Sequence, residues 1–163
     1  MTGKIDTMEI LMQIRKIGRS INLESKKIEK EYGVSIPQVL CLRFLRNAEN
    51  FQAGQGEIRK FMNLNPSTTS GIINRLEAKG LVARLPKSGD KRVVTIALTS
   101  KGDQLLNSMP SLLHEKLSRK LNRLQNETIL QVQDSLELLV ELLGIDKLDA
   151  FDLNGGEDPG NIR

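Results

Sequence analysis

Apolar side chains recur along much of this chain at intervals of three or four residues, which places them on one face of an α-helix. The first such series is Ile10, Ile14, Ile17, Ile21 and Ile28. Mostly polar residues fill the positions between them, so the series predicts one amphipathic helix. Gly33, directly after Tyr32, predicts its end.

Two shorter helices are expected next. Ser35 can cap the first of them, which has Pro37 in its first turn and the apolar residues Cys41, Leu42, Phe44 and Leu45. The stretch "NAENFQAGQG" at 47–56 is expected to be loop. The second short helix places three apolar residues on one face and is expected to end at Asn63; these residues are Ile58, Phe61 and Met62.

The stretch "NPSTTSGIINRLEAKG" predicts a helix of unusual composition, with Asn65 as its cap and Pro66 in its first position. Successive residues of a helix are about 100° apart around its axis. On this helix, one side can pack on the preceding helix, and that side carries Thr69, Ile72, Ile73 and Leu76. The opposite side carries Ser67, Ser70, Gly71 and Asn74, with Thr68 and Arg75 on one flank. Gly71 alone lowers helix stability by roughly 0.5–1 kcal/mol relative to alanine.

After Gly80 the apolar period changes from that of a helix to that of a strand. The runs "LVARLP" and "RVVTIAL" are separated by "KSGDK", and together they predict a β-hairpin. A long helix is expected from Thr99 or Ser100 to about Leu124, kinked by Pro110. A last helix is expected to end at Gly144; its apolar series includes Ile129, Val132, Leu136 and Leu143.

This order of elements predicts a mainly α (α+β) fold, a winged helix-turn-helix with long N- and C-terminal dimerisation helices. We expect a single domain over 1–149 and a flexible tail over 150–163. Within the domain, 35–99 would form the DNA-binding lobe and 1–32 and 100–145 the dimerisation arms. The arms carry more apolar surface than so small a lobe can cover, which favours pairing with a second copy.

The hydroxyl and amide side chains on the outward face of the helix after Asn65 suit base edges and phosphates. The hairpin adds basic side chains suited to a DNA groove, namely Arg84, Lys87, Lys91 and Arg92. Asp90 is placed to orient Arg92. The alternatives are that Ser67 and Thr68 serve only as capping residues and that the hairpin tip is an ordinary solvated turn.

The composition excludes several classes of function for this chain. The 163 residues carry a net charge of +4, which permits a polyanionic partner. One Cys and one His exclude an intrachain disulfide and leave few ligands for a metal, so no cofactor is expected. "GQGEIR" lacks the third glycine of a dinucleotide fingerprint, and no catalytic motif is present, so we expect no enzyme. Without a signal peptide or an apolar run near ~18 residues, we expect a cytoplasmic protein with no membrane partner.

The segment from "GEIRKFMNLNPSTTSGIINRLEAKGLVARLPKSGDKR" to "LTSKG" resembles the MarR family of transcription regulators. The resemblance implies a homodimer that binds a pseudo-palindromic operator in double-stranded DNA, usually a repressor released by a small ligand or by cysteine oxidation. It also implies a recognition helix in the major groove and the Arg92 wing in the minor groove. This chain has Gly71 where many members have Arg, and Thr69 and Arg59 also depart from the family pattern, so its operator cannot be taken from a relative.

Two features bear on what the protein senses. Cys41 lies on the apolar side of its helix, which favours a buried, inert thiol over an oxidation sensor. A ligand pocket implied by the family would lie between the arms and the lobe, and no residue cluster identifies its effector. Repression and activation both remain open, as does a winged helix that binds another protein in place of DNA, although Lys91 and Arg92 count against that alternative.

Overall fold

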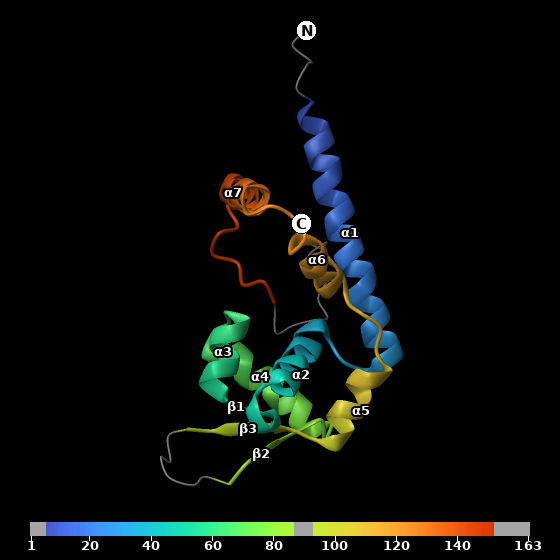
Figure 1. The fold of residues 1–163 in the computed structure, drawn as a ribbon, viewed down its shortest axis with the longest axis vertical. Helices are drawn as coiled ribbons and strands as arrows, with labels where there is room; N and C mark the ends of the chain where they lie inside the picture. Colours follow the sequence, from blue (N-terminus) through green and yellow to red (C-terminus); the bar gives the residue numbers. More distant parts are fainter. Residues whose placement is uncertain (1–5, 87–92, 152–163) are drawn as a thin grey trace, which may run out of the picture.

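The computed structural model of this protein describes residues 6–86 and 93–151. The helices in these ranges are α1 (Thr7–Tyr32), α2 (Ile36–Asn47), α3 (Gln55–Met62), α4 (Pro66–Ala78), α5 (Ser100–Ser108), α6 (Leu113–Leu121) and α7 (Asn126–Leu143). The strands are β1 (Gln52–Gly54), β2 (Val82–Arg84) and β3 (Thr95–Leu98), and a short 3-10 helix spans Glu49–Phe51. Figure 1 shows α2 to α5 and the sheet gathered into one lobe, from which α1 projects as an arm. The mainly helical winged-helix fold is confirmed.

Local capping explains why α1 ends at Gly33 and why α2 begins after Ser35, as predicted. α1 begins where the Asp6 side chain accepts a hydrogen bond from the Met8 N–H, and it ends at Gly33, whose φ of 68° is left-handed. The Ser35 hydroxyl accepts from the Gln38 N–H, and the Gln38 side chain accepts in return from the Ser35 N–H. This reciprocal pair is a capping box, which satisfies two N–H groups that the first helical turn leaves without partners.

The sheet contains a strand that the sequence pattern did not predict. β1 lies within the stretch expected to be loop, and it pairs antiparallel with β3 so that the strand order is β1-β3-β2. Asn50 and Phe51 both adopt positive φ, which turns the chain back after α2. Ala53 is buried opposite Ile96, so even this short strand has one inward side chain.

The core of the lobe is aliphatic, as the low aromatic content requires. Its fully buried side chains include Leu42, Leu45, Ile58, Ile73, Leu76 and Ile96, drawn from α2, α3, α4 and β3. Phe61, which the sequence places on the same apolar face of α3 as Ile58, is 56% exposed. Its ring instead stacks on Phe44 of α2, with the ring centroids 4.5 Å apart, at the edge of the core.

The single long helix expected from residue 100 to residue 124 is two helices. α5 ends at Ser108 and α6 begins at Leu113. Met109 has a ψ of 144° and is therefore extended, as the residue before a proline prefers because its backbone clashes with the ring in the helical region. Pro110 therefore ends the helix instead of kinking it.

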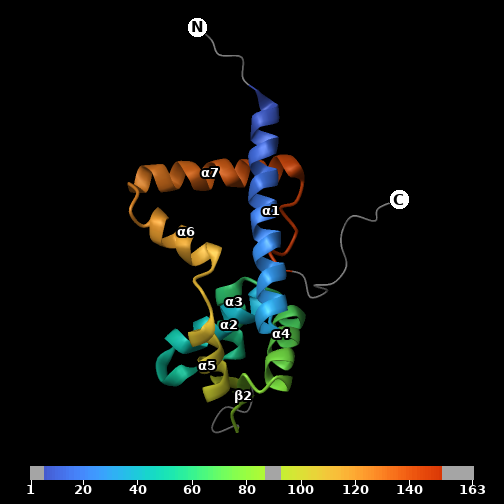
Figure 2. The same cartoon turned by 90° about the vertical axis from the view of Figure 1, so that its right-hand side faces the viewer.

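The arm helices α1, α6 and α7 carry many apolar side chains that this chain does not cover, whereas α5, expected in an arm, packs on the lobe through Leu106. Ile28 is the only buried residue of α1 in the described range, and no residue of α6 or α7 is buried. Figure 2 shows α7 lying crosswise to α1, at a distance from the lobe. Among the described residues no helix is both long enough and apolar enough to cross a membrane. Phe151 is partly buried against the core, so packing extends into the expected tail, and 152–163 lie outside the described residues.

Candidate nucleic-acid interface

The turn between α3 and α4 determines how α4 is presented. Asn63 ends α3 in the left-handed region, with a φ of 51°, and the side chain of Leu64 is buried in the core. The Asn65 side-chain oxygen then accepts from the Thr68 N–H at 2.8 Å, which caps α4 as predicted. A second contact holds the same end, because the Asn65 amide nitrogen donates to Asp149 at 3.1 Å.

The structure places most of the predicted contact residues of α4 at the surface. Ser67, Asn74 and Arg75 are exposed, and Ser70 and Gly71 are partly exposed. Thr68 is only 4% exposed, so the prediction that its side chain lies on an accessible flank is wrong. A helical wheel gives the direction of a side chain but not what covers the first turn of the helix. A direct contact with DNA from the other five residues remains a prediction.

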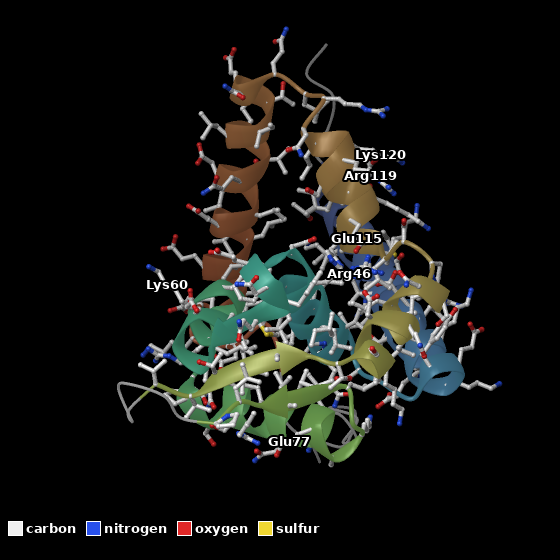
Figure 3. The ribbon with its side chains drawn as sticks, turned by 60° about the horizontal axis from the view of Figure 1, so that its bottom comes forward. Arg46, Lys60, Glu77, Glu115, Arg119 and Lys120 are labelled. Atoms are coloured by element: carbon white, nitrogen blue, oxygen red, sulfur yellow. The ribbon has the colours of Figure 1, made fainter. Side chains whose placement is uncertain are left out.

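Two of these side chains are held by neighbouring residues, of which the sequence pattern had identified Arg84 but not Gln55 or Glu77. Gln55, the first residue of α3, donates from its amide to the Ser70 hydroxyl at 2.7 Å. One turn further along α4, the Arg84 guanidinium donates to Glu77 at 2.7 Å and to Asn74 at 2.6 Å. Figure 3 shows Glu77 at the end of the lobe opposite to Arg119 and Lys120 of α6. The exposed α4 surface is therefore ordered by contacts from α3 and β2.

The predicted wing contacts cannot be placed in the same way. Lys87, Asp90, Lys91 and Arg92 lie outside the described residues, and only the flanking strands β2 and β3 are described. These strands pair antiparallel, with Arg84 opposite Ile96. Arg84 is the one wing residue of the prediction that can be assigned a position, and its guanidinium faces α4.

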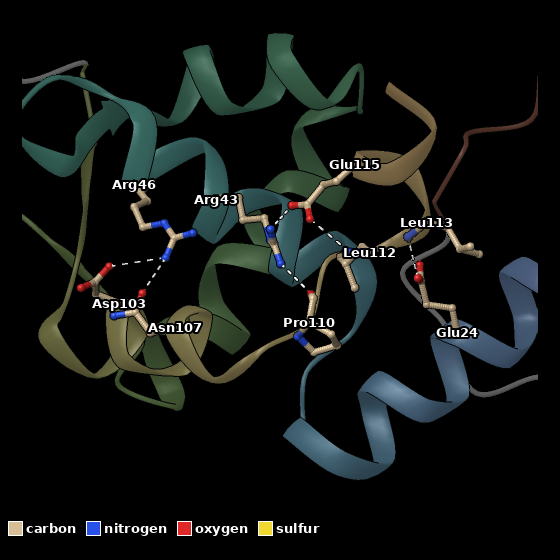
Figure 4. A network of polar contacts seen from close by, with 9 residues as sticks. All are labelled: Glu24, Arg43, Arg46, Asp103, Asn107, Pro110, Leu112, Leu113 and Glu115. Carbon is tan, nitrogen blue, oxygen red and sulfur yellow. Dashed lines mark hydrogen bonds and ion pairs between the residues drawn. The ribbon is translucent and has the colours of Figure 1, made fainter. Parts of the chain in front are cut away.

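A polar network joins the lobe to the arms (Figure 4). Arg43 of α2 forms an ion pair with Glu115 of α6 and donates to the Pro110 carbonyl oxygen at 3.2 Å. Glu24 of α1 accepts from the Leu113 N–H at 2.7 Å. Burial and the nearby Arg43 guanidinium lower the pKa of His114, the neighbour of Leu113, which favours a neutral imidazole at pH 7.

Cys41 is fully buried in α2, as expected, and this burial raises the pKa of its thiol to about 12. The thiolate is the reactive form of cysteine, so we expect Cys41 of the folded protein to be inert. At pH 8, an aromatic disulfide reagent should release no chromophore from the native protein and one equivalent after unfolding in guanidinium. Rapid reaction of the native protein would instead support the cysteine-oxidation alternative.

The chain is similar in sequence to known regulators of transcription. The model of the MarR family matches residues 34–94. The uncharacterized HTH-type transcriptional regulator YfiV of Bacillus subtilis is 28% identical over 135 residues, which cover 83% of each chain. The HTH-type transcriptional repressor MdtR of the same organism is 27% identical over 123 residues, or 76% of this chain and 78% of the relative.

A solved structure gives the same fold. The complex of Staphylococcus aureus MepR with DNA superimposes with a TM-score of 0.62 and 22% identity, covering 85% of this chain and 99% of that one. At this identity the similarity concerns the fold alone. The match over residues 34–94, the curated relatives and the order of helices and strands show a chain with the winged-helix fold that is similar to regulators of the MarR family.

Proposed function

We propose that this protein is a transcriptional regulator that binds double-stranded DNA through α4. The observation that carries the proposal is the surface of α4, where Ser67 and Asn74 are exposed on a helix that Gln55 of α3 and Arg84 of β2 contact at successive turns. An ordered surface of hydroxyl and amide groups suits base edges and phosphates, which require close approach and fixed donors. The DNA complex of MepR and the regulator names of the relatives support this proposal.

The functional unit in this proposal is a homodimer. The exposed apolar side chains on the arms include Ile10, Ile17, Ile21, Leu117, Leu130, Leu136 and Leu138. So large an apolar area is not left in water by a monomeric protein, and a second copy covers it symmetrically. Two copies of α4 would then read two halves of a pseudo-palindromic operator.

The regulatory mode we propose is repression that a small ligand releases. The relative MdtR is a transcriptional repressor, and the network around Arg43 connects α2 of the lobe to α6 of the arm. A ligand that displaced this network would change how far apart the two lobes of a dimer lie. DNA affinity would fall because both half-sites could no longer be bound at once.

DNA binding is expected to depend strongly on salt. In fluorescence anisotropy with DNA from upstream of its own gene, affinity should fall by roughly 10³- to 10⁵-fold between about 50 and 200 mM salt if 6–10 phosphates are contacted. Asn74→Ala should weaken binding and Arg92→Ala should reduce the salt slope, whereas Asn47→Ala, an exposed asparagine on α2, should change neither. Absence of binding to any genomic fragment would favour the protein-interaction alternative.

A further inference from the structure

One guanidinium connects the wing strand to the exposed surface of α4. Arg84 of β2 donates through Nη1 to Glu77 Oε1 at 2.7 Å and through Nη2 to Asn74 Oδ1 at 2.6 Å. The Arg84 backbone N–H also donates to Glu77 Oε2 at 3.3 Å. The Glu77 carboxylate thus holds both the guanidinium and the backbone N–H of Arg84, and the Arg84 guanidinium in turn holds the Asn74 amide.

This arrangement determines which end of the Asn74 amide faces Arg84. A guanidinium has only hydrogen-bond donors, so the group that it contacts must be the amide oxygen. The amide nitrogen, with its two hydrogens, is therefore at the opposite end of the group. No described residue accepts a hydrogen bond from it, and Asn74 is exposed on α4.

An asparagine amide that can turn only its nitrogen toward the DNA forms different hydrogen bonds with the bases than an amide that rotates freely. The usual pairing of asparagine with adenine needs the oxygen to accept from N6 while the nitrogen donates to N7. Because the Asn74 amide oxygen faces Arg84, only the amide nitrogen is left to contact a base, and it is a hydrogen-bond donor. Guanine offers two adjacent acceptors for it in the major groove, O6 and N7. Adenine offers one acceptor beside a donor that would face the amide nitrogen.

We propose that Glu77 is a positioning residue that acts through Arg84 to fix the Asn74 amide as a donor, which makes Asn74 select guanine. This inference rests on the proposed binding of DNA through α4. It assigns Arg84 a role other than the phosphate or minor-groove contact expected from the sequence. Glu77 itself touches no base in this scheme.

The test measures base preference, because a purely structural role of Glu77 would change stability alone. Binding sites are selected from a randomised duplex pool with the wild-type protein. Dissociation constants are then measured for wild type, Asn74→Ala, Glu77→Ala and Glu77→Gln on duplexes that differ at single base pairs. Glu31→Ala is the matched control, since it removes one exposed glutamate from α1. Thermal unfolding of each variant reports its stability.

The expected result is one G·C pair in each half-site whose replacement weakens wild-type binding by roughly 5- to 150-fold. The same replacement should have almost no effect in Asn74→Ala and Glu77→Ala. Glu31→Ala should retain the wild-type ratio, and so should Glu77→Gln, because its amide oxygen still accepts from Arg84. Replacing the guanine by 7-deazaguanine, which lacks the N7 acceptor, should weaken wild-type binding but not that of Asn74→Ala.

Other results would overturn the inference. If the pair that depends on Asn74 is A·T, the amide oxygen faces the base and the orientation is wrong. If Glu77→Ala unfolds at a lower temperature but keeps the guanine preference, Glu77 is only structural. Both results would leave the binding of DNA intact. Failure of the wild-type protein to select any site would instead overturn the proposed function, and this inference with it.

Discussion

In the proposed homodimer, Leu136→Glu is expected to separate the two copies and to lower the affinity for the proposed DNA operator by about 100-fold or more. Leu136 lies in the middle of α7 and is 51% exposed in the single chain. It lines an apolar groove together with Leu121 of α6 and Ile129, Val132 and Val140 of α7. In a dimer that covers this groove, the new carboxylate would be buried without a partner, which costs several kcal/mol.

The loss of affinity follows from losing the second half-site. Two linked modules bind with an affinity that can exceed that of either alone by roughly 10²- to 10⁴-fold. Sedimentation velocity gives the oligomeric state, and fluorescence anisotropy at fixed salt gives the affinity. Gln131→Glu is the matched control, because it adds the same charge about 140° around the helix, on its polar side. A Leu136→Glu protein that remained dimeric would show that the partner covers a different surface.

The helices whose ends are set by local chemistry were predictable from the sequence. Gly33 ends α1, and Asn65 with Pro66 begins α4. In each case a side chain or a left-handed glycine satisfies the N–H or C=O groups that a helix leaves unpaired at its ends. These interactions involve residues close together in the chain, and a pattern along the sequence records them directly.

Elements that depend on distant partners were not predictable in the same way. β1 has the sequence Gln52-Ala53-Gly54, which has no strand character by itself. It is a strand because β3, more than forty positions later, supplies its hydrogen-bond partners. The break at Pro110 is a different case, because the proline was recognised and its effect on Met109 was understated.

The same distinction between local and distant interactions applies to the candidate site. The outward position of Ser67 and Asn74 follows from helical geometry alone. The residues that order this surface, Gln55 and Glu77, are polar residues of ordinary appearance, and only the fold brings them to Ser70 and Arg84. The spacing of Asn74 and Glu77, three residues apart on one helix, is the one sequence feature that could have suggested a shared partner.

Gly102→Ala is expected to destabilise the folded protein by about 3 kcal/mol or more. Gly102 is the glycine of the "LTSKG" motif, is buried, and lies in the first turn of α5. A Cβ atom at this position would lie 2.3 Å from the Leu81 carbonyl oxygen and 2.7 Å from the Leu98 Cδ1 atom. Both distances are far below van der Waals contact, so part of the backbone must move.

The backbone that would have to move is held on several sides. The Leu81 carbonyl oxygen accepts from the Thr99 N–H at 3.2 Å, and the Leu81 N–H donates to the Leu76 carbonyl oxygen at 3.0 Å. A shift of Leu81 would therefore disturb the end of α4 and the start of β2 together. Urea unfolding followed by circular dichroism, at one protein concentration, measures the free energy of unfolding.

The matched control for this substitution is Gly56→Ala in α3. No atom outside its own helix lies within 4 Å of the added Cβ position, so the same methyl group meets open space. Alanine also restricts the unfolded chain more than glycine does, and we expect this variant to gain roughly 0.4–1 kcal/mol of stability. Equal stability of the two variants would mean that the close contact between α5 and Leu81 is not present in solution.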